Sequence, residues 1–195
     1  MVDRARCDVV ADIFPRRDRI RTERLLLRPW RDEDAEAFHL MGQDPEVMRF
    51  LGPPMSLEDC RAAVIRSNQT LADQGSCFWA LERHSDLAFI GFCGVKRGPA
   101  GTPIADDLEI GWRLARATWG QGYAREAAMA TLDWAWANTD APRVAAITVP
   151  ANEASWGLMI RLGMTRLPDG DFDHPALAPG NPLRRHLTYA IERPH

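Results

Sequence analysis

The most informative chemistry in this chain lies in residues 118–126, where Gly120 and Gly122 flank Gln121 just before an alanine-rich helix. Glycine lets the backbone approach a ligand closely, and the first turn of a helix presents N–H groups that no carbonyl of the helix accepts. The positive end of the helix dipole adds an attraction for anions. This turn is therefore predicted to bind a phosphate or pyrophosphate; a helix start without a ligand is the alternative.

A second group of polar residues opens the helix that follows the next predicted strand. Asn152 is a favourable N-cap, Ser155 lies in the same first turn, and Gly163 is expected to end the helix. These residues describe either a capped amphipathic helix with no further role or one wall of a ligand site.

Glu109 stands within a predicted strand over residues 107–114. Alternation along a strand places it on the same face as Gly111 and Arg113, opposite Ile110. An acidic side chain in this position either faces solvent or lines a cleft.

Two common phosphate-binding motifs do not fit the glycine turn. A P-loop requires Lys-Ser/Thr after its last glycine, whereas Gly122 is followed by Tyr123 and Ala124. A dinucleotide fingerprint requires glycine or alanine where Arg125 stands. A nucleotide-dependent oxidoreductase is therefore only a distant alternative.

Helices and strands alternate along the chain and must position these groups. Helices are expected from Asp32, from Ser56 to about Asp73 with a Ser56–Asp59 capping box, from about Gly120 to Ala137, and from Asn152. Strands are expected over residues 22–30, 77–83, 87–95, 107–114, 144–149 and 186–191. Short connections predict an antiparallel meander, and the strand–helix–strand segment predicts a parallel pair. The predicted fold class is α+β, a mixed and mostly antiparallel central sheet with helices on both faces.

Length and composition narrow the class of protein. The 195 residues suit a single domain over residues 20–195, preceded by a loose leader over residues 1–19. A net charge of −3 argues against a nucleic-acid surface, and no apolar run reaches the ~20 residues of a membrane helix. The N-terminal residues show no secretion or transit signal, so a cytoplasmic location is expected. Exposed sheet edges and seven tryptophans are compatible with a homodimer.

No metal centre is predicted from the spacing of candidate ligands. The four cysteines lie too far apart for a CxxC site. Asp171, Asp173, His174 and His186 belong to a proline- and glycine-rich tail segment, for which a hydrogen-bonded loop is the simpler interpretation.

The ordered combination of these motifs resembles the GNAT superfamily of N-acetyltransferases over roughly residues 22–191. Gly122 and Ala124 fill the last two places of its R/Q-x-x-G-x-G/A pyrophosphate loop, with Trp119 where arginine or glutamine is usual. The helix opened by Asn152-x-x-Ser155 matches the other acetyl-CoA-contacting motif of that superfamily. The segments Thr22–Trp30, Asp44–Met48 and Trp119–Ala124 are similar to the ribosomal-protein-alanine acetyltransferase branch.

This resemblance implies a splayed strand pair that holds acetyl-CoA as cosubstrate. The residues expected to contact it are Trp112, Arg113, Leu114, Trp119, Gly120, Gln121, Gly122, Tyr123, Ala124, Asn152 and Ser155. Arg125 and Arg161 are further candidates near the phosphates. The resemblance also implies that Glu109 acts as general base through a water molecule. A family tyrosine that protonates the departing thiolate falls at Met159, so Ser155 or water is the expected proton donor.

The predicted activity is direct transfer of acetyl from acetyl-CoA to a primary amine, either a protein N-terminal α-amine or the amine of a small molecule. The acceptor is expected between Trp30, the turn at residues 48–51 and the loop at residues 171–186. A non-catalytic acyl-CoA-binding module, used for sensing or assembly, is the alternative, because the usual tyrosine is missing. Release of free thiol from acetyl-CoA in the presence of an amine separates the two.

Overall fold

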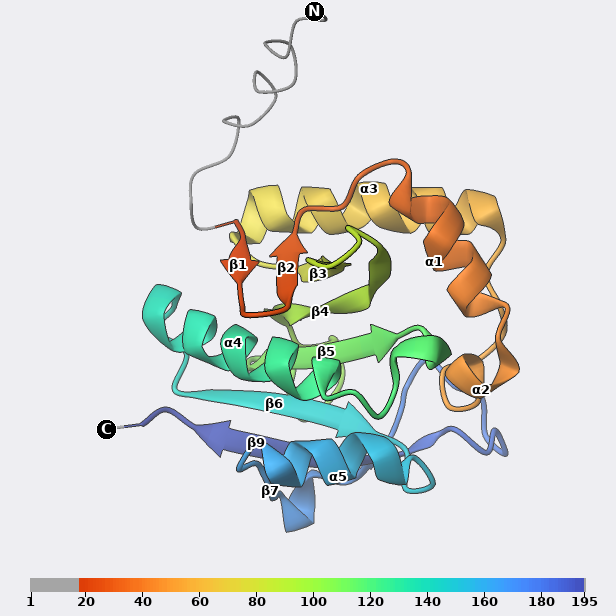
Figure 1. Cartoon of the computed structure of the whole chain (residues 1–195). Helices are drawn as coiled ribbons and strands as arrows, with labels where there is room; N and C mark the ends of the chain where they lie inside the picture. The colour runs from red at the N-terminus through yellow and green to blue at the C-terminus, as the bar shows by residue number, and fades with distance from the viewer. Residues whose placement is uncertain (1–17, 195) are drawn as a thin grey trace, which may run out of the picture.

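The computed structural model describes residues 18–194 and forms one central sheet with helices packed against it (Figure 1). The predicted leader lies almost entirely outside the described residues. The domain boundary at residue 20 stays a prediction.

A mixed sheet runs through the described residues and positions the site. Its strands are β1 (Ile20–Arg21), β2 (Leu25–Arg28), β3 (Phe78–Arg83), β4 (Phe89–Arg97), β5 (Leu108–Leu114), β6 (Arg143–Thr148), β7 (Thr165–Arg166), β8 (Phe172–Asp173) and β9 (Arg185–Glu192). Their order is β1-β2-β3-β4-β5-β6-β9-β7, and β8 pairs with β9. Within residues 18–194, β5 and β6 are the one parallel pair, so the predicted mixed and mostly antiparallel sheet is confirmed.

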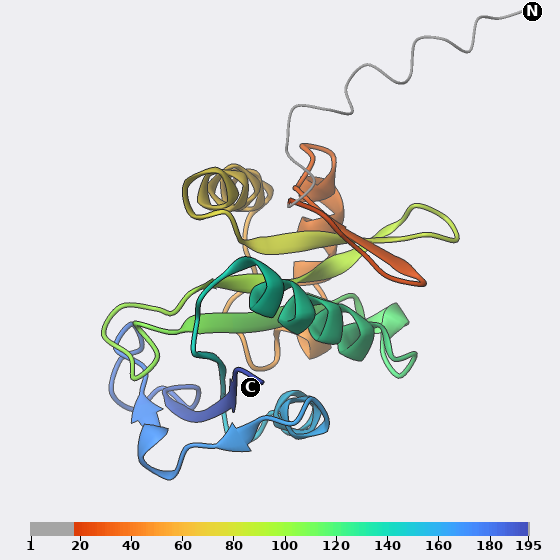
Figure 2. The ribbon, with the colours of Figure 1, turned by 90° about the vertical axis from the view of Figure 1, so that its left-hand side faces the viewer.

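Helices cover both faces of this sheet, as predicted. They are α1 (Asp34–Gly42), α2 (Pro45–Met48), α3 (Leu57–Gln74), α4 (Tyr123–Asn138) and α5 (Glu153–Arg161). One apolar cluster joins α4 and α5 to the sheet, and a second joins α1, α2 and α3 to it. Trp79 and Leu81 of β3 belong to the first cluster and Ala80 to the second, because successive side chains of a strand alternate between faces. Figure 2 shows α3 and α4 on opposite sides of the sheet.

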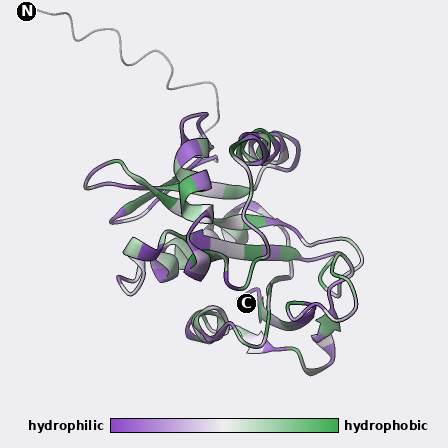
Figure 3. Cartoon of the chain, turned by 90° about the vertical axis from the view of Figure 1, so that its right-hand side faces the viewer, coloured by the Kyte–Doolittle hydropathy of each residue, from purple (hydrophilic) through white to green (hydrophobic). Residues whose placement is uncertain are grey.

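The longest helix, α3, begins and ends where local chemistry directs it. The Ser56 hydroxyl accepts a hydrogen bond from the Asp59 amide (3.1 Å), and the Asp59 carboxylate accepts one from the Ser56 amide (3.3 Å). Gly75, with φ of 75°, then ends the helix in the left-handed region. The predicted capping box is confirmed, and Figure 3 shows hydrophobic and hydrophilic residues along α3, as expected for a helix with one covered side. None of the helices in the described part of the chain has the length and apolar character needed to span a bilayer.

Two predicted boundaries near the N-terminus are wrong. The strand expected over residues 22–30 is present but shorter, as β2 (Leu25–Arg28), because the Thr22 amide donates to the Leu25 carbonyl (2.9 Å) and residues 22–24 turn the chain between β1 and β2. The N-cap of α1 is Glu33 rather than Asp32, and it makes no side-chain cap. The Asp34 carboxylate instead accepts a hydrogen bond from the Arg31 amide (2.7 Å), which orders the chain just before the helix.

The parallel pair opens into a fork. β5 and β6 pair at Leu108 with Val144 and at Glu109 with Ala145; β5 then continues to Leu114 without β6 as its partner. The predicted splayed strand pair is therefore confirmed. Since α4 connects the two strands, its N-terminus lies beside the open end of the fork (Figure 1).

Candidate functional site

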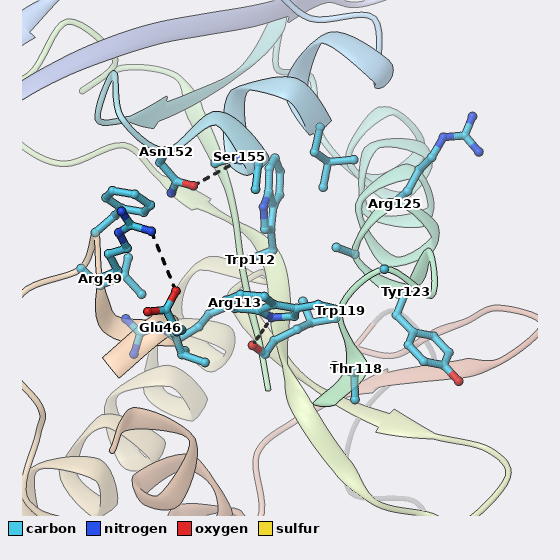
Figure 4. A pocket seen from close by; sticks show the side chains of 18 of the residues that line it. Glu46, Arg49, Trp112, Arg113, Thr118, Trp119, Tyr123, Arg125, Asn152 and Ser155 are labelled. Carbon is cyan, nitrogen blue, oxygen red and sulfur yellow. Dashed lines mark hydrogen bonds and ion pairs between the residues drawn. The ribbon is translucent and has the colours of Figure 1, made fainter. Parts of the chain in front are cut away.

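A cavity of about 590 Å³ occupies the open end of the fork (Figure 4). Four segments supply its walls: α2 with the turn after it, the end of β5 that does not pair with β6, the glycine turn with the start of α4, and one side of α5 with its N-cap. The lining residues are Glu46, Val47, Arg49, Phe50, Leu51, Trp112, Arg113, Leu114, Thr118, Trp119, Gly120, Gly122, Tyr123, Ala124, Arg125, Asn152, Ala154, Ser155, Leu158 and Arg161.

The glycine turn presents backbone donors to this cavity. Gly120 has φ of 72°, and Gly122, the N-cap of α4, has φ of 82°. Both values lie in the left-handed region, where side chains bearing Cβ are strained. Gly122 has no side chain to cap the helix, so the N–H groups of the first turn stay available to an anion.

A network from the β1–β2 hairpin fixes the glycine turn from behind. Arg24 donates from Nε to the Glu126 carboxylate (2.6 Å) and from Nη1 to the Gln121 carbonyl (2.9 Å). Its guanidinium also lies over the Tyr123 ring, 4.5 Å from the centroid. The Thr22 hydroxyl donates to the same Glu126 carboxylate (2.6 Å). The backbone of the turn is therefore positioned by residues about a hundred positions earlier in the chain.

Trp119 connects the glycine turn to the end of β5. Its indole Nε1 donates to the Leu114 carbonyl (2.8 Å), and the residue remains 47% exposed at the mouth of the cavity. The Ala115 amide donates to the Ile90 carbonyl of β4 (2.9 Å). The end of β5 is thus held on both sides.

The start of α5 forms the opposite wall. The Asn152 side chain accepts a hydrogen bond from the Ser155 amide (3.3 Å), and both residues line the cavity. Gly163, with φ of 84°, follows the last residues of the helix, so both predicted ends of α5 are confirmed. Met159 is only 1% exposed and belongs to the apolar core, so its side chain is not part of the cavity wall.

Glu109 lies at the point where β5 and β6 separate, but it is not among the lining residues. Its side chain is 13% exposed and lies 3.5 Å from Lys96 Nζ, which in turn lies over the Phe78 ring at 5.0 Å. The Oε2 atom is buried and has no hydrogen bond, although it is near this ammonium group. Burial raises the pKa of Glu109, and the positive charge of Lys96 opposes that increase. The carboxylate is neither solvent-facing nor in the cavity wall.

Arg113 shares the face of Glu109, as strand alternation predicted, and reaches the cavity. Its guanidinium lies over Phe38 (5.7 Å) and Phe92 (5.3 Å). Figure 4 shows the side chain extending from β5 toward α2. Burial lowers the pKa of Arg113.

The cavity brings together all of the predicted cosubstrate-contacting residues except Gln121. Gln121 instead donates from its side chain to the Ala117 carbonyl (3.0 Å). Arg125 and Arg161, predicted near the phosphates, both line the cavity. Glu46 and Val47 were not predicted to line the site, although the segment Asp44–Met48 that contains them carries part of the family resemblance.

Only part of the region where the acceptor is expected lies at the cavity, because Met48 and residues 171–186 are not among its lining residues. Arg49, Phe50 and Leu51 line the cavity. Trp30 does not, because it is 6% exposed and packs against Phe38 inside the second apolar cluster. The prediction that Trp30 forms part of the acceptor pocket is wrong.

The tail segment before β9 is held by its own contacts. Asp171 pairs with Arg166, and the His174 and His186 rings lie 5.1 Å apart beside Phe172. Asp173 lies 3.4 Å from Arg184. In residues 18–194 no group of three or more His, Cys, Asp or Glu side chains is arranged to hold a metal ion.

The fold and the cavity define a class of protein: a forked mixed sheet in which the glycine turn and the uncapped start of α4 line a cavity at the open end of the fork. The model of the acetyltransferase (GNAT) domain matches residues 24–165. The chain belongs to the GNAT family and is an acetyl-CoA-dependent acyltransferase.

The chain is similar to the following proteins in sequence or in fold. Bacillus subtilis YkkB, an uncharacterised protein, is 33% identical over 144 residues, which are 73% of this chain and 83% of YkkB. A crystal structure of a GNAT acetyltransferase from Bacillus anthracis has a TM-score of 0.74 and 27% identity, over 90% of this chain and 98% of that one. RimL, a ribosomal L7/L12 α-N-protein acetyltransferase solved with coenzyme A, shares the fold with a TM-score of 0.71 at 18% identity, over 89% and 97% of the chains.

Proposed function

We propose that this enzyme transfers acetyl from acetyl-CoA directly to a primary amine bound at the fork between β5, β6 and α2. The observation that carries the proposal is the convergence of the free end of β5, the glycine turn and the start of α5 on one cavity. The non-catalytic alternative rests on the absence of the tyrosine that usually protonates the thiolate. Ser155 or a water molecule could donate that proton instead, and no other feature of residues 18–194 favours the alternative.

The residues that line the fork fit acetyl-CoA. Open N–H groups at the start of α4 and the guanidinium groups of Arg125 and Arg161 supply donors and positive charge for its phosphates. A helix N-terminus is worth only about 0.3–2 kcal/mol to an anion, whereas micromolar affinity needs about 8 kcal/mol. Contacts along β5 and α5, from Trp112 to Leu114 and from Asn152 and Ser155, supply the remainder.

We assign the general-base role to Glu109, acting through water. Burial raises its pKa, which makes the carboxylate a better proton acceptor, and its Oε2 atom makes no hydrogen bond although it lies 3.5 Å from Lys96 Nζ. At pH 7 an α-amine with a pKa near ~8 costs about 1.4 kcal/mol to deprotonate, whereas lysine at ~10.4 costs nearly ~5 kcal/mol. An α-amine is therefore the easier acceptor for this site.

Ser155, or a water molecule beside it, returns a proton to the departing thiolate. Ser155 lines the cavity, while Met159 lies in the core and has no proton to give. The products are an N-acetyl amide and the free thiol of coenzyme A.

The acceptor is either a protein N-terminus or a small-molecule amine. The resemblance of Thr22–Trp30 and Asp44–Met48 to ribosomal-protein acetyltransferases favours an N-terminal α-amine, and the coenzyme A complex of RimL offers a parallel within this fold. A cytoplasmic location and a homodimer stay predictions.

Thiol release from acetyl-CoA with a panel of primary amines tests the proposal. We expect release with at least one α-amine, and a decrease of about tenfold or more in kcat for Glu109→Gln. Glu58→Gln is a matched control, because Glu58 is exposed on α3 and does not line the cavity. Tight binding of acetyl-CoA without thiol release from any amine would instead support the non-catalytic module.

A further inference from the structure

Arg113 carries a positive charge that no carboxylate in the described part of the protein pairs with. Its Nε atom is buried and has no hydrogen-bond partner. Among residues 18–194, no carboxylate lies within ion-pair distance of its guanidinium. A buried N–H donor without an acceptor is unfavourable, so the protein keeps this Nε atom unsatisfied at a cost in stability.

The groups that surround Arg113 do not provide a counter-charge. The guanidinium lies over the faces of Phe38 and Phe92, which attract a cation. The two rings have no oxygen or nitrogen atom that could accept a hydrogen bond from the guanidinium N–H groups. Burial raises the pKa of the neighbouring Cys60 thiol, which is therefore neutral near pH 7. The aromatic rings fix the guanidinium in place and leave its donors available toward the cavity that it lines.

The charges of the cavity are distributed unevenly. Arg125 and Arg161 lie on α4 and α5, where the phosphates of the cosubstrate account for them under the proposed function. On the α2 side, Glu46 is the one acidic lining residue described, and it lies 3.9 Å from Arg49. The thioester end of the cosubstrate carries no charge that could pair with Arg113. A positive charge therefore remains on the acceptor side of the cavity.

We propose that the side chain of Arg113 binds a carboxylate of the acceptor, and that the acceptors of this enzyme are amines that carry a carboxylate close to the reacting nitrogen. The planar guanidinium forms paired hydrogen bonds with a carboxylate, which also supplies the missing counter-charge. Free amino acids and peptides with an acidic residue next to the N-terminus share this chemistry. The inference rests on the proposed function, since it describes the other substrate of the same site.

Matched pairs of amines test this inference. Each pair compares a carboxylate with its amide: a free amino acid with its amino-acid amide, and an amidated peptide with aspartate at position two with the same peptide bearing asparagine. We expect the wild type to favour the acid by about tenfold or more in kcat/KM, as for hydrogen bonds to charged groups. The pair that shows the larger ratio identifies whether the source is a free amino acid or a peptide.

Variants connect the preference to the side chain. Arg113→Gln is expected to bring the acid-to-amide ratio close to one, and Arg113→Lys to give an intermediate ratio, because lysine keeps the charge but loses the planar fork. Arg97→Gln is the matched control, since Arg97 lies in β4, pairs with Asp106 and does not line the cavity. An unchanged ratio in Arg113→Gln would overturn the inference.

Binding measurements separate this inference from the proposed activity. Calorimetric titration of the protein with coenzyme A and each acid–amide pair reports carboxylate recognition without turnover. Tighter binding of the acid than of the amide, lost in Arg113→Gln, supports the inference even if no thiol is released. The absence of thiol release would then reject only the proposed acetyl transfer. Equal binding of acid and amide by a folded wild type, together with thiol release from uncharged amines, rejects the inference and leaves the transfer intact.

Discussion

Arg28 and Arg113 lie in opposite environments, because Arg28 is buried among carboxylates whereas Arg113 is half-buried with a buried Nε atom. Arg28, beneath α1, donates to Asp34 from both terminal nitrogens (2.7 and 2.8 Å) and to Glu82 from Nε (2.8 Å). Arg113, beside the cavity, has aromatic neighbours and no carboxylate. Charges that hold the fold together are paired within the protein, whereas a charge left unpaired beside a cavity is available to a ligand.

The largest effect is expected when the paired arginine is removed. Arg28→Met leaves the buried Asp34 and Glu82 carboxylates short of donors, and removing one partner of a buried pair costs about 3–5 kcal/mol. Denaturant unfolding measures this loss. Arg113→Gln should cost far less or slightly stabilise the protein, so an equal loss in both variants would contradict the distinction between the two arginines.

Glu109→Gln is the second largest perturbation, and it concerns activity rather than folding. We expect kcat to decrease about tenfold or more while the unfolding midpoint changes little, because glutamine keeps the shape of the side chain and loses only the 3.5 Å ion pair with the partly exposed Lys96 ammonium. Thiol release and thermal unfolding of the same preparations distinguish the two effects. A normal kcat would remove Glu109 from the mechanism.

Arg24→Ala tests the network behind the glycine turn. Loss of the contacts to Glu126 and to the Gln121 carbonyl should loosen the turn and increase KM for acetyl-CoA about fivefold to tenfold, with little change in kcat. Arg21→Ala is the control, since Arg21 is exposed on β1. A change in kcat alone would mean that Arg24 acts on the chemical step and not on the turn.

Lys96→Met should shift the pH profile. The Lys96 ammonium lowers the pKa of Glu109, so its removal raises that pKa further. Because the base must be ionised to accept a proton, activity in the variant should begin to rise at a higher pH than in the wild type. Initial rates across the acidic range, at saturating acetyl-CoA, measure this shift, and a shift to lower pH would contradict it.

Trp119→Phe is expected to have the smallest effect. Phenylalanine keeps an aromatic ring at the mouth of the cavity and loses only the hydrogen bond to the Leu114 carbonyl, worth about 0.5–1.5 kcal/mol. The affinity for acetyl-CoA, followed by titration, should weaken a few fold. No change at all would show that β5 is held in place without the indole.

The features that could be predicted from the sequence have local causes. Helix ends are defined by contacts within a few residues, as at Ser56 with Asp59, at Asn152 and at Gly163. The left-handed conformation of the glycine turn follows from the glycines themselves. The remaining features depend on residues far apart in the chain. The hydrogen bond from Arg24 to Glu126 spans 102 positions, and nothing near either residue indicates the other.

The local sequence also does not predict which side chains surround Glu109 and Arg113. Strand alternation correctly placed Glu109 and Arg113 on one face, but only the packed structure sets Lys96 beside the first and aromatic rings beside the second. Trp30 shows the same limit, because its sequence context resembles a site motif while the packing of α1 encloses it.

The fork affects the stability of the folded protein as well as its chemistry. Beyond Glu109, β5 has no strand paired to it on the β6 side. An unpaired strand edge can form hydrogen bonds with another chain and so promotes aggregation. A cosubstrate that binds along this edge stabilises the folded state by mass action, by about 2.7 kcal/mol at a concentration a hundred times its Kd. The supply of acetyl-CoA would then govern how long each molecule stays folded as well as how fast it works.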